Sequence, residues 1–302
     1  MIEVKNLTKT FKREKNLFSS EFNALEDVSF HIGENEIIGF LGANGAGKTT
    51  TNKILMDFIP KTSGEIIYDK KMGSNFYSIR QSIGYLPERP YFYPHLTGQM
   101  FLEYLANLSE VPENQAKDLI IKWTKKLKIN FALKQKVRSY SKGMLQRLGL
   151  ASVLLHDPKV IILDEPLSGL DPIGRMDIKN IILDLYQEGK TVFFSSHIVS
   201  DVEAICKKVV FLEKGKLVYD GSIDKLLKDY GNLHYECQCF IPEEKKLSIE
   251  PRHQEEGVSL FEFEEKRKKD FLQEITENNI DLISLKQIKP SLEEVIYKIR
   301  ES

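Results

Sequence analysis

Residues 39–51 read GFLGANGAGKTTT, a glycine-rich turn that follows the apolar run EIIGFL at 36–41. Glycine loses more conformational freedom on folding than any other residue, so a turn of this composition needs a reason. Gly42, Gly47, Lys48 and Thr49 have the spacing G-x4-G-K-T, and the segment lies between an apolar strand and a helical pattern. That spacing in that context predicts a loop whose backbone N–H groups turn inward around phosphate oxygens.

The chemistry of this loop indicates a nucleoside triphosphate with Mg²⁺, and the loop and the acid pair described next do not by themselves separate kinases, helicases, GTPases and transporters. The N-terminus of the following helix adds partial positive charge, and the Lys48 ammonium supplies a full charge for the β- and γ-phosphates. The Thr49 hydroxyl is a hard oxygen ligand suited to Mg²⁺. The residues expected to bind the nucleotide are Gly42, Ala43, Asn44, Gly45, Ala46, Gly47, Lys48, Thr49 and Thr50.

A pair of acids ends a second apolar strand, VIILDE at 160–165, and Asp164 lies 116 residues after Lys48. In a parallel sheet the carboxyl ends of neighbouring strands meet at one edge, so this acid pair can face the phosphates. Asp164 would hold Mg²⁺ through its water shell. Glu165 would polarise the water that attacks the γ-phosphate.

The periodicity predicts an α/β fold, and the glycine turn assigns that fold to the P-loop NTPase class. Short buried strands at 37–41, 160–164 and 191–196 alternate with helical patterns, which favours a mostly parallel sheet. Half-exposed alternation at 2–11 and 24–32 predicts an additional N-terminal antiparallel β subdomain. A helix is expected from Lys48 to about Phe58, and the charged stretch at 12–23 reads as a long loop.

The chain divides into two expected domains. Residues 1–221 carry the phosphate loop and form a nucleotide-binding domain, with a helical subdomain at about 95–155. Residues 222–302 have the pattern of a small α+β accessory domain in which we find no catalytic constellation.

Composition limits the remaining possibilities. The chain has 302 residues, 41% of them hydrophobic, and a net charge of −1, so a globular protein without nucleic acid as a partner is expected. Three cysteines cannot form a disulfide framework, which favours a reducing compartment. Cys237 and Cys239 share a strand face and would be either a metal half-site or, the favoured reading, buried thiols. The start has no apolar signal-peptide core, and no apolar run spans a bilayer, so any membrane role is expected to be peripheral.

Three further segments decide which kind of P-loop protein this is. YSKGMLQR at 140–147 precedes the acid strand, SGLD at 168–171 follows it, and His197 comes after FFSS. In this order the segments resemble the ATP-binding-cassette (ABC) ATPases, and the resemblance covers about residues 1–221. IGYLPE at 83–88 and PSLEEV at 290–295 are similar to the branch that serves ABC-2-type export permeases.

The resemblance implies roles for specific residues. Ser141 and Gly143 would form a signature loop that contacts the γ-phosphate bound to the opposite protomer, so two chains would be needed. The partner would be a second copy of this chain or a related ABC ATPase chain. Asp171 would communicate across the dimer interface, and His197 would contact the γ-phosphate and help to hold the attacking water.

The chain departs from the family pattern at three places. Glu88 stands where many relatives have glutamine, and its carboxylate can still ligate Mg²⁺. Lys142 replaces the first glycine of the signature and is expected to point to solvent; Met144 replaces the glutamine. Phe11 matches the aromatic that stacks on adenine, with Phe18 and Phe22 as alternatives.

The resemblance implies an ATP-hydrolysing transporter subunit that lies in the cytoplasm on the inner face of the membrane. ATP-driven closure and reopening of the dimer would power transport, with export expected, through a separate integral membrane permease of the ABC-2 type. The permease would dock near Glu88 and Tyr91–Tyr93, although those tyrosines could equally be core residues. Two alternatives stay open: a soluble ABC ATPase acting on nucleic acid or the ribosome, and a regulatory module that binds ATP without useful turnover.

Overall fold

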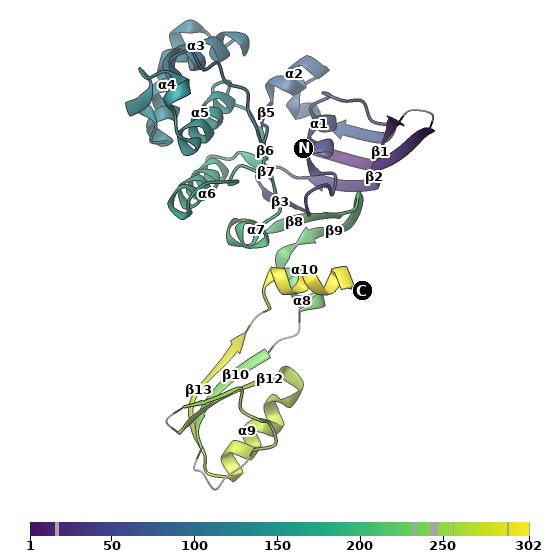
Figure 1. The fold of residues 1–302 in the computed structure, drawn as a ribbon, viewed down its shortest axis with the longest axis vertical. Helices are drawn as coiled ribbons and strands as arrows, with labels where there is room; N and C mark the ends of the chain where they lie inside the picture. The colour runs from purple at the N-terminus through teal and green to yellow at the C-terminus, as the bar shows by residue number, and fades with distance from the viewer. Residues whose placement is uncertain (16–17, 232–233, 242–246, 256, 289, 302) are drawn as a thin grey trace. The chain divides into compact units, whose positions relative to one another are not determined.

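The chain forms two compact units, Met1–Ser222 and Ile223–Ser302 (Figure 1). The structure is a computed structural model that describes residues 1–15, 18–231, 234–241, 247–255, 257–288 and 290–301. Among these residues no helix has the length and apolar character needed to cross a bilayer.

A six-stranded sheet forms the centre of the first unit, with the strand order β5-β6-β7-β3-β8-β9. The first five strands run parallel and β9 runs antiparallel to β8. Its central strands are wholly buried, as an apolar strand covered on both faces requires. The strands are β5 (Ile83–Leu86), β6 (Val160–Asp164), β7 (Thr191–Ser196), β3 (Ile37–Leu41), β8 (Lys208–Glu213) and β9 (Lys216–Ser222).

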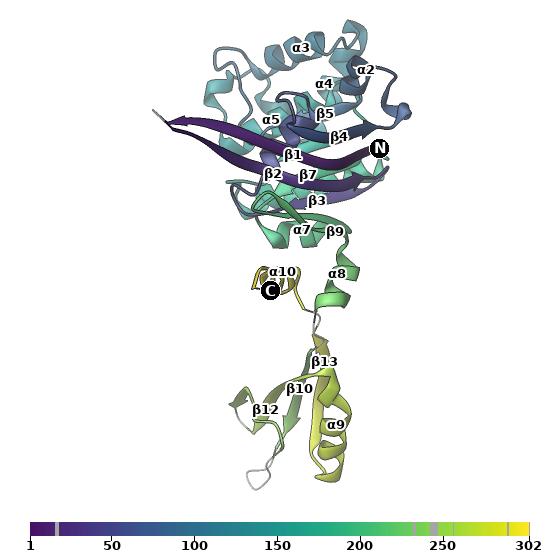
Figure 2. The same cartoon turned by 90° about the vertical axis from the view of Figure 1, so that its right-hand side faces the viewer.

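A second, antiparallel sheet has the order β2-β1-β4, which confirms the predicted antiparallel β subdomain beside the parallel sheet. Its strands are β1 (Ile2–Lys15), β2 (Phe18–Ile32) and β4 (Ser63–Tyr68). The prediction of a long loop at 12–23 is wrong, because β1 and β2 extend through most of it as one hairpin (Figure 2). The charged composition suggested a loop, but backbone pairing in a solvated hairpin does not require apolar side chains.

The helices of the first unit include a separate group at 98–154, where α3 (Gly98–Leu108), α4 (Glu113–Lys126) and α5 (Lys142–Leu154) lie together (Figure 1). Thr97 caps α3 as expected, since its hydroxyl accepts from Met100 N, and Trp123 is almost fully buried. The other helices are α1 (Lys48–Leu55), α2 (Phe76–Gln81), α6 (Pro172–Gln187) and α7 (Val199–Ile205).

Helix α1 ends at Leu55, so the prediction that it reaches Phe58 is wrong. Asp57 has φ 54°, a left-handed conformation that cannot continue a right-handed helix. The short helix α2 and the 3₁₀ turns were not predicted from the sequence. Six residues offer too little hydrophobic periodicity to identify a helix.

The core of the first unit joins both sheets. Phe30 of β2 stacks on Phe193 of β7 with ring centroids 5.8 Å apart, and Phe40 of β3 lies 4.9 Å from the same ring. Leu55 of α1 belongs to the same buried cluster. Because strands of both sheets and α1 share this core, the loop between β3 and α1 is anchored at both ends.

The second unit contains a four-stranded antiparallel sheet in the order β11-β12-β10-β13. Phe271 of α9 packs against Phe261 and Phe263 with centroid distances of 5.1 and 4.5 Å. Its elements are α8 (Ile223–Tyr230), β10 (His234–Phe240), β11 (His253–Glu255), β12 (Val258–Glu264), α9 (Lys268–Glu277), β13 (Asp281–Ile288) and α10 (Leu292–Glu301).

Cys237 and Cys239 lie in the core of this second unit, and both are fully buried. Their sulfur atoms are 3.2 Å apart, and burial raises the pKa of both thiols. Within the described ranges no group of three or more potential ligands could hold a metal ion. The cysteine pair is therefore a buried, unreactive part of the core, which was the favoured alternative.

Candidate functional site

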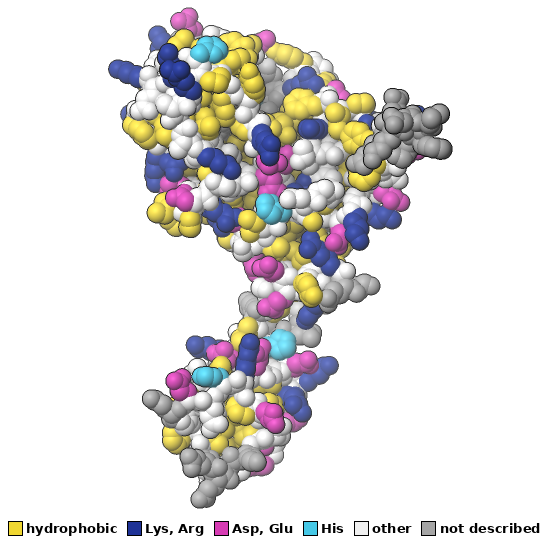
Figure 3. Space-filling view, in the orientation of Figure 1, with side chains coloured by type: hydrophobic (Ala, Val, Ile, Leu, Met, Phe, Trp, Pro, Cys, Tyr) yellow, Lys and Arg dark blue, Asp and Glu magenta, His cyan; other side chains and the backbone are white. Residues whose placement is uncertain are grey.

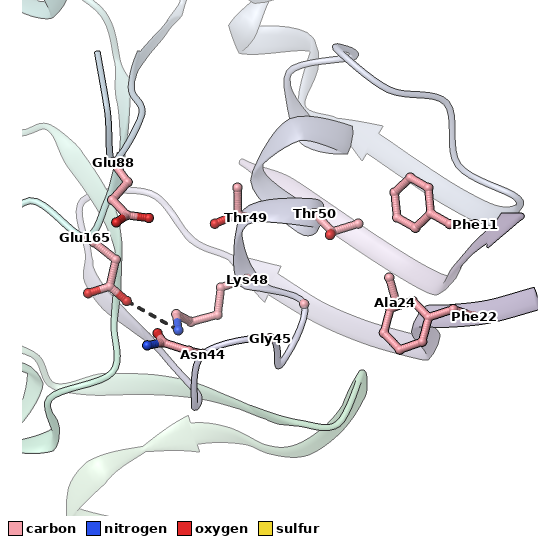
Figure 4. Close-up of a pocket in the computed structure, with 11 residues that line it drawn as sticks. Phe11, Phe22, Ala24, Asn44, Gly45, Lys48, Thr49, Thr50, Glu88 and Glu165 are labelled. Carbon is pink, nitrogen blue, oxygen red and sulfur yellow. Dashed lines mark ion pairs between the residues drawn. The ribbon is translucent and has the colours of Figure 1, made fainter. Parts of the chain in front are cut away.

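A cavity of about 500 Å³ opens between the glycine turn, the end of β6 and the β1–β2 hairpin (Figure 4). A volume of this size suits a nucleotide-sized ligand. One side of the cavity is charged and hydroxylated, and the other side is aromatic. It is lined by Phe11, Phe22, Ala24, Asn44, Gly45, Gly47, Lys48, Thr49, Thr50, Glu88 and Glu165.

The glycine turn has the backbone conformation that the motif predicts. Gly45 and Gly47 have φ values of 85° and 108°, which a side chain would disfavour. A Cβ atom on Gly47 would also lie only 2.7 Å from the carbonyl oxygen of Ala24. Gly47 is the N-cap of α1, so the first N–H groups of that helix open toward the cavity.

Not every residue of the predicted loop lines the cavity. The carbonyl oxygens of Gly42 and Ala43 accept hydrogen bonds from Lys48 Nζ at 2.7 and 3.3 Å, which holds the lysine along the turn. Ala46 is buried, and its N–H donates to Ala43 O at 3.1 Å. These three residues shape the turn, whereas Asn44, Gly45 and Thr50 face the cavity.

Lys48 and Glu165 form a buried ion pair across the cavity wall. Their Nζ and Oε1 atoms are 3.3 Å apart, and the two side chains are only 6% and 10% exposed (Figure 4). Charges this far from solvent interact more strongly than a surface pair does. The lysine of the turn and the acid at the end of β6 therefore face the same part of the cavity.

His197 lies on the other side of the same carboxylate. Its Nδ1 atom is 2.8 Å from Glu165 Oε2. The contact follows from topology, because β6 and β7 are parallel neighbours and both residues come directly after their strands. Glu165 itself has φ 50°, an uncommon conformation for a residue other than glycine, asparagine or aspartate.

Ser195 is a site residue that the sequence analysis missed. It lies opposite Asp164 in the β6–β7 pairing and is fully buried. Its hydroxyl donates to Asp164 Oδ1 at 2.5 Å and accepts from the backbone N–H of Glu165 at 3.1 Å. One hydroxyl thus orients both acids. The signal available in the sequence was Ser195 itself, the first serine of the FFSS segment.

Replacing Ser195 by alanine should reduce ATP turnover by about tenfold, the scale of one hydrogen bond to a buried charge. It should also raise the Mg²⁺ concentration needed for half-maximal activity, because Asp164 would lose its orientation. Ser196→Ala is the matched control, since among the described residues the Ser196 hydroxyl bonds to the backbone of Ile198 and not to either acid. A titration of turnover against Mg²⁺ that gives the same curve for both variants would contradict this role.

The oxygen atoms near Lys48 suit a magnesium ion. Asp164 Oδ2 is buried and has no hydrogen-bond partner in the described part of the chain, so it is available to a ligand. Thr49 and Glu88 project toward the same end of the cavity (Figure 4). Carboxylate and hydroxyl oxygens are the donors that Mg²⁺ prefers. Burial and the charge of Asp164 raise the pKa of nearby Tyr85, which stays a neutral phenol.

The predicted signature residues do not line this cavity within one chain. Ser141 caps α5, with its hydroxyl accepting from Met144 N at 3.3 Å, and Asp171 caps α6 by accepting from Gly174 N at 3.0 Å. Lys142 is exposed, and its side chain passes over Gly169. A Cβ atom added to Gly169 would lie 1.8 Å from Lys142 Nζ.

The aromatic end of the cavity is formed by two residues rather than one. Phe11 of β1 and Phe22 of β2 are cross-strand partners and both line the cavity. The side chain of Phe18, the other alternative, lies outside the described part of the structure.

Comparisons with known proteins agree with this geometry. Residues 25–168 match the family described as ABC transporter. An ABC transporter ATP-binding protein of Nostoc sp. is 44% identical to this chain. The match covers 71% of this chain and 64% of that relative. One of Synechocystis sp. is 39% identical over 94% of this chain and 79% of its own length. The solved structure of an ATP-binding subunit of an ABC transporter superposes with a TM-score of 0.65 at 27% identity, covering 76% of this chain and 93% of that chain.

Proposed function

Because the chain belongs to the family of ABC transporter ATP-binding proteins, we propose that it powers export through a separate membrane permease. It is an ATPase whose substrate is ATP with Mg²⁺, on a P-loop NTPase fold.

The proposed mechanism of ATP hydrolysis is based on the position of the Glu165 carboxylate. The Glu165 carboxylate lies between Lys48 Nζ, at 3.3 Å, and His197 Nδ1, at 2.8 Å. A carboxylate so placed can accept a proton from a water molecule that approaches the γ-phosphate. His197 holds the carboxylate from the outer side and can contact the γ-phosphate, so Glu165 and His197 are the proposed catalytic pair.

Phosphate binding uses charge and backbone together. Lys48 supplies a positive charge for the β- and γ-phosphates, while the N–H groups of the glycine turn surround their oxygens. Mg²⁺, held by Thr49, by Asp164 through water and by Glu88, would neutralise part of the triphosphate charge.

The proposed dimer is based on the position of the signature loop. Ser141 and Gly143 are at the N-terminus of α5, a helix start that suits an anion, yet they do not line the cavity of their own chain. We infer that they complete the site of a second copy or a related chain, with Asp171 at the same interface. ATP would then close the dimer, and hydrolysis would reopen it.

The permease is proposed to dock beside the helical subdomain. Tyr91 is 78% exposed, and its ring lies 5.5 Å from that of Tyr93, which in turn lies 5.6 Å from Tyr104. Figure 3 shows hydrophobic side chains gathered around α3 on this unit. An ABC-2-type permease would place the chain on the cytoplasmic face of the membrane.

Purification of the tagged chain from its native membrane in mild detergent tests the docking site. We expect a polytopic membrane protein to co-purify with the unmodified chain and to be lost with Tyr91→Glu, because a charge at the contact would have to be desolvated. Tyr230→Glu, at an exposed tyrosine of the second unit, is the control and should retain the partner. Equal recovery with both variants would place the docking site elsewhere.

A further inference from the structure

We propose that Asp201 is a positioning residue for His197. Its buried carboxylate is held by Arg175 and Lys179 of α6, and this contact fixes α7 and with it the imidazole that faces Glu165. The inference rests on the proposed role of His197 in hydrolysis. It adds to that role a residue that does not line the cavity.

Asp201 is a buried acid that α6 encloses with two cations. Arg175 Nη2 lies 2.5 Å from Asp201 Oδ2, and Lys179 Nζ lies 2.8 Å from Asp201 Oδ1. The two cations are four residues apart, so they share one face of α6, beside α7 (Figure 1). Because the Asp201 side chain is only 4% exposed, its charge depends on these two partners rather than on water.

Helix α7 needs such a contact to be held in one direction. It has only seven residues, and Ile198 at its N-cap makes no side-chain hydrogen bond to the helix. A helix this short is marginal unless tertiary contacts hold it. Val202 packs on Gly39 of β3, but apolar packing is not directional. The two charged contacts of Asp201 supply the direction that this packing lacks.

Helix α6 can act as the support because it is anchored elsewhere in the same unit. Asp177 of α6 lies 2.8 Å from Arg147 Nη2 of α5 and 3.1 Å from Lys128 Nζ. Ile178 and Ile182 are buried, and α6 contacts β7. The cations that hold Asp201 are therefore carried by a helix whose own position is fixed.

His197 lies between two held points of the chain. Ser196 before it is buried, and the Ser196 hydroxyl bonds to both the N–H and the carbonyl oxygen of Ile198. Asp201 follows four residues after His197. The His197 side chain is 39% exposed, so little packing holds the ring itself. Release of Asp201 would free the start of α7, and the imidazole would lose its 2.8 Å contact with Glu165 Oε2.

Steady-state turnover of the full chain tests the effect on rate. Asp201→Asn keeps the shape of the side chain but removes the charge that both cations face. The kcat for ATP should fall by about tenfold, since even a small displacement of a reacting group lowers the rate. KM should stay unchanged, because the glycine turn is untouched. Asp184→Asn is the matched control, at an acid of α6 that pairs with Lys126, and should change neither constant.

The ¹⁵N resonances of the His197 ring give a readout that a purely structural role of Asp201 would not move. Their loss in His197→Gln assigns them. In the unmodified chain the contact with Glu165 should hold one tautomer of the ring, whereas Asp201→Asn should show a mixture of tautomers. Arg175→Gln, which leaves Lys179 to pair with Asp201, should give a smaller change in the same direction. Thermal unfolding checks that each variant is folded.

The outcomes separate this inference from the proposed function. Normal kcat in a folded Asp201→Asn chain would overturn the inference, and so would a fall in kcat with unmoved His197 resonances. If Asp201→Asn does not fold, unmoved His197 resonances in Arg175→Gln would overturn it instead. Normal turnover in His197→Gln would refute the catalytic role of His197, while the resonances would still decide whether Asp201 positions the ring.

Discussion

Replacing Glu165 by glutamine should lower the ATP turnover of the purified chain by about 10²-fold or more, the scale for removing a general base. Glutamine has nearly the same shape but cannot accept a proton from the attacking water. It also removes the negative charge that Lys48 and His197 now face. ATP should therefore still bind, and the closed dimer should accumulate because reopening requires hydrolysis.

Two measurements check this result together. Phosphate release gives turnover, and size-exclusion chromatography with ATP and Mg²⁺ gives the dimer fraction. Glu188→Gln is the control, since Glu188 pairs with Lys126 outside the cavity and should leave both measurements unchanged. Normal turnover in Glu165→Gln would remove this residue from the mechanism, whereas lost turnover without a dimer would leave Glu165 in place and refute the closed ATP-bound state.

Replacing Lys48 by alanine should weaken ATP binding itself by on the order of 10²-fold, the scale for charge-assisted hydrogen bonds in a buried site. The change removes the ammonium that bridges Gly42 O, Ala43 O and the Glu165 carboxylate. Glu165, a mostly buried acid, would then lose this cation, and its negative charge would repel the triphosphate.

Equilibrium titration with AMP-PNP separates this effect from that of Glu165→Gln, which should affect turnover and not affinity. Lys53→Ala is a matched control, because Lys53 belongs to the same helix α1 but is exposed. Thermal unfolding of Lys48→Ala would show whether the fold persists. Retention of the original affinity in a folded Lys48→Ala chain would contradict the role assigned to the glycine turn.

Most of the phosphate chemistry could be predicted from local sequence. The glycine turn, Lys48 and Thr49 are contiguous, and their chemistry depends on backbone conformation within a few residues. The caps of α3, α5 and α6 were equally readable, because Thr97, Ser141 and Asp171 act on N–H groups only three residues away.

The failures of prediction had a different origin. The extension of β1 and β2 through residues 12–23 depends on pairing between strands and not on the apolar content of either strand. Ser195 looked like an ordinary strand residue until β6 and β7 aligned it with Asp164. Phe22 could be named only as an alternative, because its position depends on the register of the hairpin.

The sequence by itself thus determined the kind of ligand, the family and the groups proposed to bind phosphate, since those depend on short contiguous segments. Only the tertiary structure decided which distant groups share one site: Glu165 between Lys48 and His197, Ser195 behind both acids, and two phenylalanines at the aromatic end of the cavity. The physical reason is that strand order and register, which place such groups within hydrogen-bonding distance, arise from packing across the whole domain.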